Sequence, residues 1–146
     1  MGGHPWFYFV PYQRDIDKAL QELKQTEFRA GRYNPVIPFP DFPVGPDSPS
    51  PGPRHSSIRH ALRASMEDGT RSILDMDSVS KEPDYCKVCR LGDEDLLRLY
   101  STTEPTREMV EDLLFLEDAE RGQGVYIIVY KDLHPSEILF AGYSFD

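Results

Sequence analysis

With 146 residues, 39% of them hydrophobic, the chain is long enough to bury a core without disulfide bonds, and its length favours a single domain over residues 1–146. No apolar run reaches the roughly 18 residues of a membrane-spanning helix, and the N-terminus lacks the features of a secretory signal. We therefore expect a cytoplasmic protein without a membrane partner.

The charge of the chain is strongly asymmetric. The net charge is −9, with +2 over residues 1–63 and −11 over residues 64–146. An acidic surface of this size repels nucleic acid and suits a basic protein partner. The same charge also serves to keep a protein soluble, so it does not by itself assign a function.

The first 30 residues predict a strand followed by a helix. The aromatic run Trp6–Tyr12 is typical of a strand, and Pro11 places the strand end or a sheet edge there, because proline donates no backbone hydrogen bond. Apolar residues at helical spacing then predict a helix over Asp15–Ala30, which Gly31 ends.

Residues 34–53 contain eight prolines, too many for a helix or an interior strand. The apolar residues between the prolines of Pro35–Val44 suggest an extended strap that lies on the domain and covers a sheet edge, whereas Gly45–Pro53 is polar and resembles a mobile loop. A proline-rich ligand for an aromatic groove is the alternative interpretation.

Five segments are expected to form elements or connectors between this segment and residue 120. A helix is predicted over Arg54–Met66, with Ser56 or Ser57 as its cap and Ile58, Leu62 and Met66 on its buried side, and Arg71–Met76 is either a strand or a connector. The further predictions are a strand over Tyr85–Leu91, a short helix over Asp93–Tyr100 and a helix over Thr106–Glu120 with Met109, Val110, Leu113, Leu114 and Leu116 toward the core.

The last 22 residues carry the clearest pattern in the chain. Val125–Tyr130 and Ile138–Tyr143 are apolar and flank the polar connector Lys131–Glu137, which predicts a hairpin with a loop longer than two residues. The first run is nearly all apolar, as expected of an interior strand covered on both faces. The elements together predict an α+β fold: one mixed, mostly antiparallel sheet of about five strands, with helices on one face and the proline-rich strap.

Three groups of residues are candidates for chemistry. Cys86 and Cys89 form a CxxC pair, which supplies two of the four ligands of a structural zinc site, but no second CxxC is present. Pro83 and the strand-like context do not match a redox motif at a helix start. Two ordinary small residues on a strand are the simpler interpretation.

The second group is basic and lies at the start of the helix over Arg54–Met66. It could bind a phosphate or a carboxylate through arginine, with a histidine as acid or base, or it could pair with the acidic half of the chain. The candidate anion-binding residues are Arg54, Arg59 and Arg63, and the candidate catalytic residues beside them are His55 and His60.

The third group lies near the hairpin, where Glu137, His134 and Tyr130 have the side chains used in general acid–base catalysis. Nothing in their spacing requires such a role. Pairing of Tyr126 and Tyr130 with Phe140 across the strands explains the aromatic residues equally well.

Three functions are compatible with these observations. The first is a binding or inhibitory module without catalysis, comparable as a class to immunity proteins or antitoxins, that covers a basic partner. The alternatives are a small enzyme for an anionic substrate, using the basic group, and a zinc-stabilised structural domain. The residues expected to contact a basic partner are Glu108, Glu111, Asp112, Glu117 and Asp118.

Overall fold

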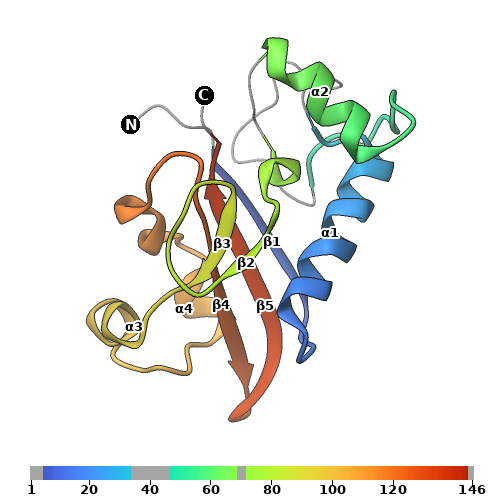
Figure 1. The fold of residues 1–146 in the computed structure, drawn as a ribbon. Helices are drawn as coiled ribbons and strands as arrows, with labels where there is room; N and C mark the ends of the chain where they lie inside the picture. The colour runs from blue at the N-terminus through green and yellow to red at the C-terminus, as the bar shows by residue number, and fades with distance from the viewer. Residues whose placement is uncertain (1–4, 34–46, 69–71, 145–146) are drawn as a thin grey trace.

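The computed structural model describes residues 5–33, 47–68 and 72–144, which contain one five-stranded mixed sheet (Figure 1). The strand order is β1-β5-β4-β3-β2. β5 pairs antiparallel with both β1 and β4, and β3 pairs parallel with both β4 and β2. The predicted α+β class with a five-stranded mixed sheet is confirmed. The strands are β1 (Pro5–Pro11), β2 (Ser78–Ser80), β3 (Lys87–Arg90), β4 (Gly124–Lys131) and β5 (His134–Tyr143).

The hairpin of β4 and β5 lies in the middle of the sheet, as predicted, but its loop is shorter than expected. The turn consists of Asp132 and Leu133 alone, both with positive φ, of 52° and 67°. Two consecutive residues in this conformation form the tight turn that matches the twist of a hairpin. His134 and Pro135 therefore belong to β5 and not to a loop.

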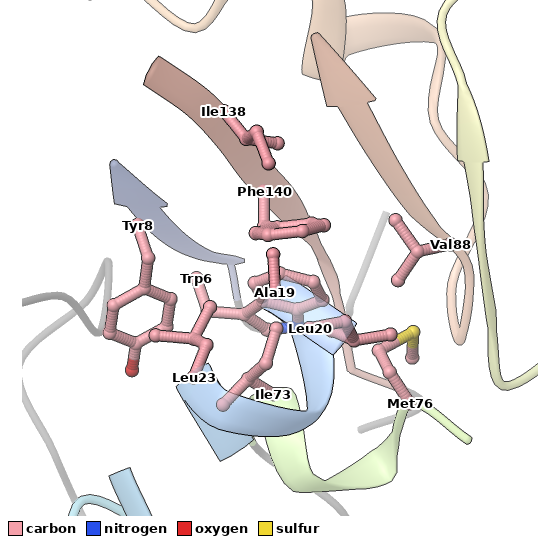
Figure 2. Close-up of a cluster of buried hydrophobic side chains, with 10 residues drawn as sticks. All are labelled: Trp6, Tyr8, Ala19, Leu20, Leu23, Ile73, Met76, Val88, Ile138 and Phe140. Carbon is pink, nitrogen blue, oxygen red and sulfur yellow. The ribbon is translucent and has the colours of Figure 1, made fainter. Parts of the chain in front are cut away.

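Helix α1 (Ile16–Ala30) covers one face of the sheet. The Asp15 side chain accepts a hydrogen bond from the backbone N–H of Lys18 at its start, and Gly31 ends it with φ 77°, as the sequence predicted. Figure 2 shows the buried side chains of α1 packed against β1, β5 and β3. This first core contains Trp6, Tyr8, Ala19, Leu20, Leu23, Ile73, Met76, Val88, Ile138 and Phe140.

The opposite face is also covered, so the prediction of helices on one face is wrong (Figure 1). The cover consists of α3 (Asp93–Tyr100), α4 (Arg107–Val110) and the 3₁₀ helix η2 (Leu114–Asp118). β4 and β5 are apolar on both faces because each face meets a separate core. This second core contains Leu96, Val110, Phe115, Leu116, Ile127, Val129, Leu139 and Ala141.

The predicted helix over Thr106–Glu120 is interrupted. Leu113 has φ 56°, in the left-handed region, and lies between α4 and η2. The Asp112 side chain accepts a hydrogen bond from the N–H of Leu114 at 3.0 Å, a local contact that competes with helical bonding. Phe115 is buried in place of Leu114, which together with Met109 remains exposed.

Helix α2 (Ile58–Asp68) begins four residues later than predicted, and Arg54 to Ser57 lie before its first turn. Ser57 caps it by accepting a hydrogen bond from the N–H of His60 at 3.2 Å. Ile58 and Leu62 pack on a small cluster that contains Phe28 of α1 and Tyr33, which follows α1. Met66 is 79% exposed and is not part of the buried side.

Within the strand candidate Arg71–Met76, the described residues form a 3₁₀ helix, η1 (Ile73–Asp75). The additional strand is β2, which begins seven residues after the start of that candidate. In the predicted strand over Tyr85–Leu91, Cys86 has φ 59°, so regular alternation begins only at Lys87.

Of the predicted strap and loop at about 34–53, residues 34–46 lie outside the described residues. Residues 47–53 have no helix or strand and lie against the end of α1, where the N–H of Gly52 donates to the carbonyl of Ala30 at 2.9 Å. Among the described residues, no helix is both long and apolar enough to cross a membrane.

Candidate functional site

The layer of α3, α4 and η2 concentrates the charge of the protein. Residues 93–120, here called the acidic layer, carry ten Asp or Glu side chains and two arginines, a net charge of −8 of the −9 in the whole chain. The first turn of α3 contributes Asp93, Glu94 and Asp95, where the positive end of the helix dipole stabilises carboxylates. The five residues predicted to contact a partner, Glu108, Glu111, Asp112, Glu117 and Asp118, all lie in this layer and are all exposed.

The two arginines of the acidic layer are ion-paired. One Arg98 nitrogen, Nη2, lies 2.9 Å from Oδ1 of Asp95 and 3.2 Å from Oδ2 of Asp118, which links α3 to η2. Arg107 pairs with Glu111 at 3.3 Å and with Glu137 of β5 at 2.9 Å. Most carboxylates of the layer are not neutralised by these two cations, so the surface stays negative.

Large apolar side chains are exposed between these charges. Leu97 of α3, Met109 of α4 and Leu114 of η2 are 52%, 42% and 43% exposed. Apolar side chains surrounded by polar ones are typical of surfaces that bind other proteins, because the apolar groups gain most from being covered.

A pocket of about 490 Å³ opens within this region. It lies beside the ends of β2 and β3, between α3, η2 and residues 119–125. Leu99, Phe115 and Val125 give it apolar walls, and charged side chains of both signs surround them. The charged lining residues are Lys81, Glu82, Arg90, Asp95, Arg98, Asp118 and Glu120.

The basic residues predicted to bind an anion are exposed. Arg54 lies before α2, and Arg59 and Arg63 project from α2. The neighbouring histidines make local contacts: Nδ1 of His55 lies 2.9 Å from the buried Tyr33 hydroxyl, and His60 is hydrogen-bonded to the Ser56 hydroxyl. These contacts fix the chain that leads into α2.

The two cysteines are free and have different surroundings. Cys89 is buried, donates weakly to the carbonyl of Lys81 at 3.4 Å and lines the pocket, whereas Cys86 is close to the charges of Asp75 and Asp77. Burial raises the pKa of both thiols, and these carboxylates raise that of Cys86 further. No group of three or more His, Cys, Asp or Glu residues suited to a metal ion occurs in the described ranges.

The polar residues near the hairpin are divided between structural contacts. Glu137 is ion-paired with Arg107, whose guanidinium carbon also lies 4.1 Å from the centre of the Phe9 ring. Tyr126 is the cross-strand partner of Phe140, with ring centres 6.2 Å apart, as expected. Glu137 and Tyr130 line a second pocket of about 630 Å³ at this end of the hairpin, whereas His134 is exposed at the turn.

Several buried polar groups were not predicted. Glu27 is 2% exposed, and its Oε1 atom lies 2.8 Å from Nη1 of Arg32. The buried hydroxyl of Tyr8 faces the same carboxylate, and burial followed by this neighbouring charge raises the pKa of Tyr8. Lys24 is also buried, which lowers its pKa. Lys24 and Glu27 lie on the buried side of α1, but polar side chains at such positions are normally expected to face solvent.

Comparison with known proteins gives no match: no protein-family model fits the chain, and no curated protein or solved structure is similar to it.

Proposed function

We propose that this protein is a protein-binding module whose acidic layer contacts the basic surface of a partner. The observation that carries the proposal is the concentration of a net charge of −8 in residues 93–120, on the cover of one sheet face. The exposed Leu97, Met109 and Leu114 lie in the same layer and provide apolar contact area.

The two features have separate roles in association. Exposed carboxylates attract a basic partner over a distance and accelerate encounter, an effect that salt screens within about 10 Å at 0.1 M. The apolar side chains contribute once water is excluded from them. A partner whose working surface is basic would be blocked by such contact, which makes an inhibitory role the natural consequence of binding.

Three carboxylates of the acidic layer are suited to a test because, among the described residues, they form no ion pair within 4.0 Å: Glu108, Asp112 and Glu117. Changing them to Gln, Asn and Gln removes three negative charges and retains side-chain size. Asn at 112 also keeps an oxygen that can accept the hydrogen bond from Leu114.

The test is affinity capture from a lysate of the source organism at low salt, followed by a salt step and quantitative mass spectrometry. The unmodified protein is expected to retain one basic protein near stoichiometry and to release it in salt, and the triple variant is expected to retain at least about tenfold less. The matched control is Glu22→Gln/Asp47→Asn/Asp132→Asn, which removes three exposed carboxylates outside the acidic layer.

Equal loss of capture in both triple variants would show that only the total charge matters, and the proposed surface would be wrong. Capture that persists in high salt and in the acidic-layer variant would contradict the proposal as well.

A further inference from the structure

We propose that the 490 Å³ pocket of the acidic layer receives one arginine side chain of the partner, whose guanidinium is held by Asp95 and Asp118. The inference rests on the proposed function, because it specifies how the basic partner is recognised there.

The lining of the pocket matches the two parts of an arginine side chain. Arginine has an apolar stem, which packs against apolar surface, and a planar guanidinium, which binds carboxylates. Leu99, Phe115 and Val125 offer the apolar wall, and Asp95 and Asp118 of the same lining come from two different elements, α3 and η2. A buried arginine is also among the commonest anchors of protein interfaces.

The two carboxylates already hold one guanidinium, that of Arg98. The contact uses a single nitrogen, which approaches Oδ1 of Asp95 and Oδ2 of Asp118. Each carboxylate retains a second oxygen, and the side chains of Asp95 and Asp118 are 48% and 71% exposed. A second guanidinium can therefore reach both carboxylates, in competition with Arg98.

The other cations of the lining do not reverse the local charge. Arg90 is paired with Asp93 at 2.9 Å, and Lys81 is followed by Glu82 in the same lining. Glu120 adds a further carboxylate, and the surrounding acidic layer has a net charge of −8. The site consequently favours a cation over an anion of the same size.

The probe for the test is a capped arginine, acetyl-arginine methylamide, titrated into the ¹⁵N-labelled protein and followed by NMR. Acetyl-citrulline methylamide is the matched control, because it has nearly the same shape without the charge. Capped arginine is expected to shift the backbone amides of Leu91, Gly92 and Val125, all of which line the pocket, and the citrulline compound is expected to leave them unchanged.

Two variants are expected to change the affinity in opposite directions. Asp95→Asn/Asp118→Asn removes both carboxylates and is expected to weaken binding of capped arginine at least about tenfold, the scale of a hydrogen bond to a charged group. Arg98→Gln removes the competing guanidinium and is expected to strengthen binding about threefold or more. A loss of folding would not strengthen binding, so the second variant separates recognition from stability.

The charge-matched control is Glu94→Gln/Glu104→Gln, which alters two exposed carboxylates of the acidic layer that do not line the pocket. This variant is expected to keep the affinity within about twofold. The pocket proposal is overturned if capped arginine shifts no lining amide, or if Arg98→Gln leaves binding unchanged or weaker. If the pocket proposal fails but a basic partner is still captured, only the pocket proposal is wrong and the acidic-layer proposal stands. If capped arginine binds in the pocket but no basic partner is captured, the acidic-layer proposal is the one that is contradicted.

Discussion

The indole ring of Trp6 lies so close to the backbone of Gly142 that a Cβ atom at position 142 would be 2.7 Å from Cζ2 of Trp6. The two residues are direct partners in the pairing of β1 with β5, and Gly124 of β4 is the next residue across the sheet. A Cβ atom at position 124 would lie 3.2 Å from Cη2 of the same ring. Two glycines side by side thus provide the space for a fully buried tryptophan.

Gly142→Ala is therefore expected to destabilise the protein by roughly 2–3 kcal/mol, as overpacking of a core does. The added methyl group would also meet the carbonyl oxygen of Gln123 at 2.7 Å, so relief requires a shift of the backbone. Urea unfolding followed by tryptophan fluorescence measures the loss. Gly92→Ala is the control, since a Cβ atom there has no heavy atom within 4 Å, and its cost is expected to stay below about 1 kcal/mol. Similar losses in the two variants would show that the close approach is not the cause.

Elements whose signals are local were predictable from the sequence. The helix over Asp15–Ala30 has its apolar period and its stop residue, Gly31, within 17 positions, and the structure places both as expected. The central hairpin was predictable for the same reason, except for its turn. Asp132 and Leu133 both adopt positive φ, which a leucine rarely does, so the sequence favoured a longer loop.

Elements that depend on distant contacts were predicted less well. The segment around Leu113 has a helical apolar pattern, yet the second core buries Phe115 and leaves Leu114 exposed. The exposure of the acidic layer could be predicted from its charged side chains alone. The pocket could not be predicted, because its lining residues lie between Lys81 and Val125 in the sequence and only the folded sheet brings them together.

Removal of the Arg32 side chain is expected to destabilise the protein by about 3 kcal/mol, because it leaves the buried Glu27 carboxylate without its partner. The Arg32 Nε group also donates to the carbonyl of Ser48 at 3.0 Å, so the loop against α1 would lose a contact. Urea unfolding of Arg32→Ala gives the value, with the exposed Arg29→Ala as control. Arg32→Ala/Glu27→Gln is expected to recover part of the loss, since no charge remains buried. A double variant less stable than Arg32→Ala would contradict this account.

Stability is expected to depend on the ionisation of Glu27. Burial raises the pKa of its carboxyl group, although Arg32 opposes the shift. The folded state therefore binds the proton more tightly than the unfolded state. The contribution of Glu27 to stability is full below the unfolded pKa of about 4.3 and declines as the pH rises through the folded pKa. The free energy of unfolding of the unmodified protein, relative to Glu27→Gln, should fall as the pH rises above about 4.3 and become constant above the folded pKa. A difference that grows with pH would show that the ion pair with Arg32 outweighs burial.

Both cysteines are expected to react slowly with iodoacetamide, because burial raises the pKa of each thiol and only the thiolate is reactive. Cys86 is half-buried and should be modified before Cys89, which is 7% exposed. Mass spectrometry of the protein at pH 7.5, with Cys86→Ser to isolate Cys89, gives the two rates. Urea-unfolded protein is the reference and should react faster at both positions. Faster modification of Cys89 than of Cys86 would show that the pocket beside Cys89 opens more than the structure indicates.

The hairpin turn offers a substitution that should stabilise the protein. Leu133 has φ 67° and is 86% exposed, so its side chain contributes little packing while its Cβ atom strains the backbone. Leu133→Gly removes the strain and creates the Asp-Gly sequence preferred in this turn, and we expect a gain of about 1 kcal/mol in the free energy of unfolding. Leu133→Ala is the control, because it removes the same exposed side chain but keeps the Cβ atom. Urea unfolding should place Leu133→Ala close to the unmodified protein and Leu133→Gly above both. Equal stability of the two variants would show that the left-handed conformation of Leu133 carries no measurable cost.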